Sequence, residues 1–259
     1  MHTDETGGTV VMRRTNRLMT TGCLTILIAL IVVFAVPVSW LWYRTWHDER
    51  VNSEREETAR ASLLDRARDT ASTTAHALDT SGTTDPDALT EVIWRHTEAP
   101  VITYDATRHE FTATTTKFAQ YDGKAILGAG PVRVTRCLVF TYTHPSGQAW
   151  TSHLTERDDD TCRPGDEIND LARLARTRIA NLPDADLTRT GVQKALSPNG
   201  RLFYDITSVT REGAAVTVLV LVSNSETTVD QCYRFVRHTG SYGQDSVTAA
   251  PVAAAHCAH

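Results

Sequence analysis

The clearest chemistry in this sequence lies in four cysteines that form two equally spaced pairs. Cys137 and Cys162 are 25 positions apart, and so are Cys232 and Cys257. Four cysteines allow three pairings, and the sequence does not choose strictly among them, but the equal spacing favours one disulfide within each pair. In the chain-entropy model, each disulfide would stabilise the fold by about 3 kcal/mol. Because disulfides persist outside a reducing cytosol, this pattern predicts that the cysteines lie in an oxidising compartment.

A metal site and four unrelated buried thiols are the two alternative interpretations of the cysteines. Zinc sites commonly use close pairs such as C-x2-C, and the sequence contains no such pair. The tail His256-Cys257-Ala258-His259 is the one tight group of cysteine and histidine. The equal spacing disfavours four unrelated thiols. We therefore predict two disulfides and no metal ion.

No familiar catalytic motif accompanies the cysteines. The sequence lacks G-x-S-x-G, H-E-x-x-H, a phosphate-binding glycine loop and a dinucleotide fingerprint. The acidic run Asp158–Asp160 lacks the spaced ligands and the glycine of a calcium loop, and it is interpreted as part of a solvated linker. Trp94 and Trp150 are predicted to be core aromatic residues. We expect no catalytic residue and no cofactor, and we interpret two histidine–carboxylate neighbours as surface groups: His96 with Glu98, and His153 with Glu156.

One long apolar segment predicts a transmembrane helix. The stretch Cys23–Tyr43 contains 21 residues without a charge, and as a helix it would cover the roughly 30 Å hydrocarbon core of a bilayer. Aromatic residues at its end favour the headgroup layer, and basic residues precede it. A cleaved signal peptide would have a shorter apolar stretch and a small-residue cleavage site. The predicted interface residues are Arg13, Arg14, Arg17, Trp40, Trp42, Tyr43 and Trp46.

The orientation is predicted with the N-terminus in the cytoplasm. Arginines before and after the apolar segment are nearly balanced, so basic residues alone do not fix the topology. The short basic tail of residues 1–20 is typical of a signal anchor, and the cysteines favour an extracytoplasmic C-terminal region. We therefore expect a single-pass protein of the cell membrane, with its transmembrane helix at residues 21–43.

The region beyond the membrane is predicted to be α+β, with one arrangement occurring twice. Residues 44–79 form a stalk helix whose apolar stripe runs from Leu64 to Leu78 and packs on its own domain or, alternatively, forms a dimer seam. Residues 80–165 and 166–259 each contain helical segments followed by strands, and the short helix of the first unit is expected to begin with Asp85 as its N-cap and Pro86 at its first position. Tyr104-Asp105 and Tyr204-Asp205 lie at similar places in the two units, which suggests a duplication. A loop near residues 122–130 accounts for the different lengths.

This order of helices and antiparallel strands resembles the cystatin-like or nuclear-transport-factor-2-like architecture. That architecture occurs in membrane-anchored accessory proteins of bacterial secretion, conjugation and lipid-transport machines. The sequence contains many Arg, Ala and Thr residues but only three lysines, Lys117, Lys124 and Lys194. This composition resembles that of high-GC Gram-positive bacteria. The resemblance implies an accessory role beside the cell membrane.

Three functions are compatible with these features. The first is a non-catalytic extracytoplasmic module that binds a protein partner or assists an envelope assembly. The second is a sensor or carrier whose cavity holds a small or lipid-like molecule, and the third is a hydrolase without a familiar motif. A net charge of −5 argues against a nucleic-acid partner. The expected partners are the bilayer, a membrane or envelope protein and, through the stalk helix, a second copy of the chain.

Overall fold

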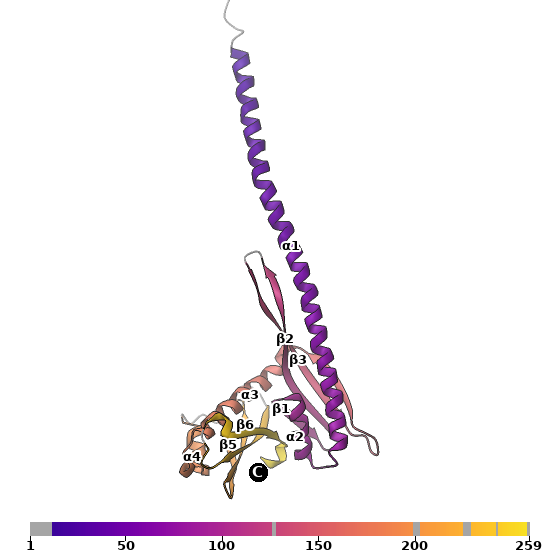
Figure 1. Cartoon of the computed structure of the whole chain (residues 1–259), viewed down its shortest axis with the longest axis vertical. Helices are drawn as coiled ribbons and strands as arrows, with labels where there is room; N and C mark the ends of the chain where they lie inside the picture. The colour runs from indigo at the N-terminus through magenta and orange to yellow at the C-terminus, as the bar shows by residue number, and fades with distance from the viewer. Residues whose placement is uncertain (1–11, 126–127, 199–202, 225–228, 242, 258–259) are drawn as a thin grey trace, which may run out of the picture. The chain divides into compact units, whose positions relative to one another are not determined.

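The chain folds into one long helix followed by two α+β halves, as the computed structural model in Figure 1 shows. The structure describes residues 12–125, 128–198, 203–224, 229–241 and 243–257. Helix α1 (Met12–Thr80) is continuous over 69 residues and passes through Pro37. No break therefore separates the predicted span from the predicted stalk.

The chain divides into two compact units, which are described separately. One unit contains Met1–Glu57 and Tyr121–Val132, and the other contains Thr58–Gln120 and Arg133–His259. Apart from residues 121–132, both α+β halves belong to the second unit. The predicted α+β class with two similar arrangements is confirmed, because two four-stranded antiparallel sheets each follow two helices.

The first half pairs the end of α1 with a second helix and a sheet in simple consecutive order. Helix α2 (Pro86–Thr97) begins as predicted, because the Asp85 side chain accepts a hydrogen bond from the Ala88 N–H and Pro86 occupies the first turn. The four strands that follow are β1 (Val101–Asp105), β2 (Glu110–Ala125), β3 (Gly128–Thr143) and β4 (Thr151–Arg157).

The apolar stripe of α1 packs against this first sheet. Its buried residues recur every three or four positions, which places them on one helix face. Small alanine side chains along the stripe allow the helix to approach the sheet closely. This arrangement is the one that we favoured over a dimer seam. The buried stripe begins at Leu63, and Leu64, where it was expected to begin, is only partly buried. The stripe comprises Leu63, Ala67, Ala71, Ala75 and Leu78, which share a core with Phe111, Leu138 and Phe140.

The second half repeats the same order with shorter helices. Strand β6 alternates strictly between buried and partly exposed residues, so one face of its sheet forms the core. The helices are α3 (Asp159–Ala180) and α4 (Arg189–Leu196), with the 3-10 turn η1 (Asp184–Asp186) between them. The strands are β5 (Tyr204–Glu212), β6 (Ala215–Ser223), β7 (Asp230–His238) and β8 (Val247–Val252), and the 3-10 turns η2 (Gln244–Ser246) and η3 (Ala254–His256) flank β8.

The predictions of two irregular segments, a linker and a loop, were wrong. The residues expected to form a linker, Asp158–Gly165, are the N-cap and first turns of α3. Acidic residues are favourable in a first helical turn because they complement the helix dipole, so the acidic run is compatible with a helix start. The loop expected near residues 122–130 is instead the paired end of β2 and β3, apart from residues 126–127, which lie outside the described residues.

The structure has the disulfide pairing that the equal spacing favours. Cys137 of β3 is joined to Cys162 of α3, with their Cα atoms 5.5 Å apart, and Cys232 of β7 is joined to Cys257 after β8, with a Cα separation of 5.8 Å. All four cysteines are buried. Cys162 lies inside a helix rather than on a strand, so the first bridge fastens the start of α3 to the first sheet.

Candidate functional site

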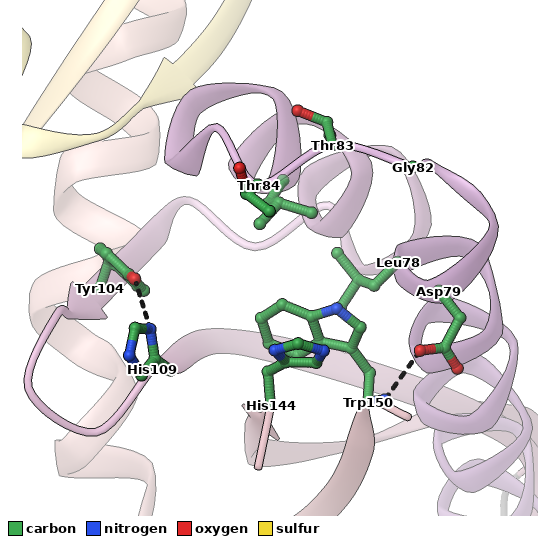
Figure 2. A pocket seen from close by; sticks show the side chains of 10 residues that line it. Leu78, Asp79, Gly82, Thr83, Thr84, Tyr104, His109, His144 and Trp150 are labelled. Atoms are coloured by element: carbon green, nitrogen blue, oxygen red, sulfur yellow. Dashed lines mark hydrogen bonds between the residues drawn. The ribbon is translucent and has the colours of Figure 1, made fainter. Parts of the chain in front are cut away.

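An open cleft of about 330 Å³ lies in the first half, where α1 ends. Figure 2 shows that its side chains come from the end of α1, from the segment that follows α1 and from the ends of the strands. The buried apolar side chains of Leu78 and Leu89 line part of it. The other lining residues are Asp79, Gly82, Thr83, Thr84, Tyr104, His109, His144 and Trp150.

Aromatic contacts hold the side chains that line the cleft against the first sheet. The Tyr104 ring stacks on buried Phe111 at a centroid distance of 4.4 Å, and Phe111 lies 5.8 Å from the Trp150 ring. The His144 ring lies 4.8 Å from the Trp150 ring. Because Phe111 is part of the hydrophobic core, it holds the half-buried aromatic side chains of the cleft in place.

Polar contacts set the orientation of the two cleft walls. On one wall, the Tyr104 hydroxyl lies 3.4 Å from His109 Nδ1. The backbone of His109 is left-handed, with φ of 49°, and its carbonyl accepts the His144 N–H at 3.1 Å. On the other wall, Asp79 Oδ1 accepts the backbone N–H of Trp150 at 2.8 Å. The cleft therefore offers hydrogen-bonding groups and aromatic edges around a small apolar surface.

The histidine–carboxylate neighbours that the sequence singled out do not meet in the cleft. Glu98 binds Lys117 at 2.9 Å, and Glu156 binds Arg60 and Arg136 at 2.8 and 3.0 Å. Their neighbours His96 and His153 are exposed. Trp94 and Trp150 are half-buried against the first core, and Trp150 also faces the cleft. Sequence reasoning missed Tyr104, His109 and His144 as cleft residues because they converge only after the sheet forms.

A second polar cluster joins the two α+β halves. The buried Gln231 side chain accepts the Ile102 N–H at 2.9 Å and donates to the carbonyls of Cys232 and Val252 at 3.0 and 2.9 Å. The Tyr233 hydroxyl donates to the Pro100 carbonyl at 2.7 Å. Burial raises the pKa of Tyr233 well above its usual range, so the hydroxyl stays neutral and keeps its proton to donate.

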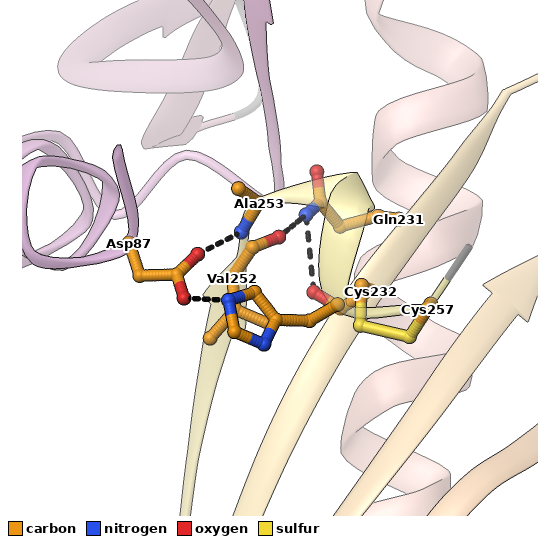
Figure 3. The surroundings of a disulfide bond; sticks show 7 residues. Asp87, Gln231, Cys232, Val252, Ala253 and Cys257 are labelled. Carbon is orange, nitrogen blue, oxygen red and sulfur yellow. Dashed lines mark hydrogen bonds and ion pairs between the residues drawn. A yellow bond between two sulfur atoms is a disulfide. The ribbon is translucent and has the colours of Figure 1, made fainter. Parts of the chain in front are cut away.

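Charged residues border this junction, and Figure 3 shows one of them, Asp87, in the surroundings of the Cys232–Cys257 disulfide. Asp87 accepts the Ala253 N–H at 3.0 Å and pairs with His256. His256 is part of the C-terminal Cys/His group in which the sequence predicted no metal ion. Glu91 binds Arg234 at 3.0 Å. Burial acts to raise the pKa of Glu91, but hydrogen bonds and charges from Arg95 and Arg234 lower it overall. Residues 258–259 of the tail lie outside the described residues.

The Gln231→Leu substitution is expected to destabilise the joined halves by about 3 kcal/mol. It leaves one buried N–H and two buried carbonyls without the amide that satisfies them, at about 1–3 kcal/mol for each unsatisfied group. Urea unfolding of the detergent-solubilised chain measures the change. The control is Gln193→Leu in α4, whose amide contacts are longer, at 3.3 and 3.5 Å, and which is expected to cost about 1 kcal/mol or less. Equal losses for the two variants would contradict the role of the junction.

The predicted membrane-interface residues all lie on α1. Among the described helices, α1 is the one long and apolar enough to span a membrane. Its large apolar side chains between Ile26 and Trp46 are 45–77% exposed, including those of Trp40, Trp42, Tyr43 and Trp46. Arg13, Arg14 and Arg17 precede this segment on the same helix. Within the described part of the chain, no group of three or more His, Cys, Asp or Glu residues is placed to hold a metal ion.

Comparison with known proteins adds one structural similarity. No known protein family matches the sequence, and no curated protein matches it. One similar solved structure is an NTF2-like protein involved in plasmid conjugation, which is 9% identical; the match covers 58% of this chain and 74% of that chain, with a TM-score of 0.15. The class of protein therefore rests on the fold described above: an α+β protein with two antiparallel sheets and one helix of membrane-spanning length.

Proposed function

We propose that this chain is a single-pass membrane protein whose disulfide-bonded region lies outside the cytoplasm and binds a protein partner of the envelope without catalysing a reaction. The observation that carries the proposal is the exposed apolar segment of α1. Elsewhere, large apolar side chains are mostly buried in the cores of the two halves. A bilayer supplies the apolar surroundings that the fold does not provide for this segment.

Two further features support the location and the passive role. The Cys137–Cys162 and Cys232–Cys257 disulfides are stable in an oxidising compartment. The helix that carries the span continues without interruption to Thr80, and the buried residues of its last part belong to the core of the first sheet. The N-terminus is then cytoplasmic, as a signal anchor requires.

The cleft is the proposed contact surface for the partner. It combines Trp150 and Tyr104, two residue types enriched in interface hot spots, with polar side chains around an apolar base. Its lining is open to solvent, and several of its residues, including Asp79 and His109, are exposed. A protruding side chain or loop of another protein fits such a surface.

A photo-crosslinking amino acid at Thr84 tests this proposal in intact membranes. We expect one dominant protein adduct, which is lost when Trp150→Ala is added. Phe118→Ala is the matched control, because Phe118 is an exposed aromatic residue that does not line this cleft, and it should leave the adduct unchanged. The absence of an adduct, or its survival in the Trp150→Ala variant, would contradict the proposal.

A small-molecule ligand is the second candidate function. The observation in its favour is the volume of the cleft, which reaches the lower end of the range for small-ligand sites. Native mass spectrometry of the purified full chain distinguishes the two functions. If a small molecule co-purifies with the parent chain and is lost in the Trp150→Ala variant, the cleft binds a ligand and the proposal of a protein partner is wrong.

A further inference from the structure

The charge of the cleft is suited to a positively charged guest. When histidine is counted as neutral at pH 7, Asp79 is the one charged residue among the described residues that line the cleft. Asp79 is exposed, and its Oδ1 atom accepts the Trp150 N–H at 2.8 Å. A carboxylate has room for further hydrogen bonds, because its two oxygens have about four acceptor sites. A cation that enters the cleft therefore meets a fixed negative charge that can still accept its protons.

The end of α1 adds negative potential on the same side of the cleft. Asp79 lies in the last turn of this helix, and that turn contains no basic residue. The carbonyl end of a helix has a partial negative charge, so an acidic residue is unfavourable there and a cation is favourable. Helices α2 and α3 have the usual arrangement, with Arg95 and His96 in the last turn of α2 and Arg178 in that of α3. A bound cation would supply the compensation that the last turn of α1 lacks.

Positive groups close to the cleft do not cancel this potential. The start of α2 has a partial positive charge, but Asp85 caps it through its side chain and Asp87 lies in its first turn. Carboxylates at these positions offset the charge of the first N–H groups of a helix. Arg108, which precedes His109 in the chain, pairs with Asp105 at 3.7 Å. These positive groups are therefore each matched by a carboxylate.

Aromatic rings provide the second feature of a cation site. Trp150 and Tyr104 are half-buried and line the cleft, and Figure 2 shows Asp79 beside Trp150. The faces of aromatic rings attract cations, and the tryptophan ring does so most strongly. Leu78 and Leu89 add an apolar surface on which a methylene chain can lie. The cleft thus combines a carboxylate, aromatic rings and an apolar base, which together match a long basic side chain.

We propose that the cleft binds a basic side chain of the partner protein and that arginine fits it best. The methylene stem of the arginine lies on Leu78 and Leu89, and its guanidinium group meets the Asp79 carboxylate beside the Trp150 ring. Arginine is favoured over lysine because a planar guanidinium group can stack on an aromatic ring while it donates to a carboxylate. This inference rests on the proposed binding of a protein partner and names the chemistry that the partner presents.

Fluorine NMR of the full chain in non-ionic detergent tests the basic side chain. The chain is labelled with 5-fluorotryptophan, and the Trp150 signal is identified by its loss in the Trp150→Phe variant. The probe is the peptide acetyl-Gly-Arg-Gly-amide, which is compared with the same peptide containing neutral citrulline in place of arginine. We expect the arginine peptide to shift the Trp150 signal and the citrulline peptide to bind about fivefold more weakly. The Trp94 signal should not move, because Trp94 packs against the same core without lining the cleft.

The Asp79→Asn variant separates the charge of this wall from its structure. Asparagine keeps a side-chain oxygen that can accept the Trp150 N–H, so the contact can persist while the charge is removed. We expect the two peptides to bind this variant within about twofold of each other. The control is Asp69→Asn, because Asp69 is exposed on α1 and does not line the cleft, and this variant should keep the preference for arginine. Equal binding of both peptides to the parent chain, or a preference that survives in Asp79→Asn, would contradict the inference.

The crosslink at Thr84 distinguishes a failure of this inference from a failure of the proposed function. If the adduct forms in both the parent chain and Asp79→Asn, and the parent chain binds both peptides equally, the protein partner stands and the basic side chain is wrong. If no adduct forms but the preference for arginine depends on Asp79, the cleft binds a cation and the proposed protein partner is wrong.

Discussion

Replacing Arg237 with methionine is expected to destabilise the second half by about 3–5 kcal/mol, the usual cost of removing one partner from a buried ion pair. The Arg237 side chain is fully buried and donates to the carbonyl of Ile179 at 2.7 Å and to that of Leu182. It also pairs with Asp184 at 3.1 Å. These contacts tie β7 to the end of α3 and to η1, so methionine fills the space but removes the guanidinium from two carbonyls and from the Asp184 carboxylate.

Urea unfolding of the detergent-solubilised chain measures this loss, and Arg211→Met provides the matched control. Arg211 also bonds to residue 184, through the Asp184 carbonyl at 3.2 Å, but it is exposed on β5. Its replacement is expected to change stability by about 0.5 kcal/mol or less. A loss at position 237 no larger than that at position 211 would show that the buried cation is not a structural element.

Two arginines in the middle of the apolar segment are expected to release most of the chain from the membrane. In the Leu30→Arg and Val33→Arg double variant, each arginine costs about 2.5–3.5 kcal/mol at the centre of a bilayer. The combined cost outweighs much of the insertion free energy of a single span. Both positions are exposed in the structure, so the substitutions do not disturb the cores of the two halves.

Alkaline carbonate extraction followed by flotation measures the membrane-bound fraction. The Leu30→Ala and Val33→Ala double variant controls for the loss of the native side chains and should remain in the membrane. Retention of the double arginine variant in carbonate-washed membranes would contradict insertion of this segment.

The features that were predicted well from the sequence depend on residues that are close together in the chain. The uncharged run in α1 and the Asp85-Pro86 helix start depend on neighbouring residues, and the structure contains both. The order of helices and strands was predicted because alternation of apolar and polar residues along a strand is also local, as in β6. The cysteine pairing could be favoured because the two equal spacings suggested the same arrangement twice.

The features that the sequence did not predict depend on contacts between distant segments. In β7, Gln231, Tyr233 and Arg237 are buried together on one face because side chains alternate along a strand. That alternation was a usable signal, but the burial of polar residues can be predicted only when their hydrogen-bond partners are known. Those partners are Ile102, Pro100 and Asp184, which lie far away in the sequence. The cleft escaped prediction for the same reason.

The oxidation state of the cysteines in the native membrane tests the central claim most directly. Free thiols are first blocked with maleimide in denaturing detergent, and a heavier maleimide then counts the thiols that appear after reduction. If the disulfide-bonded region lies outside the cytoplasm, four thiols appear only after reduction, and Cys23 reacts in the first step. The four thiols are those of Cys137, Cys162, Cys232 and Cys257. If all five thiols are blocked before reduction, the four cysteines lie in a reducing compartment, which would contradict the extracytoplasmic location.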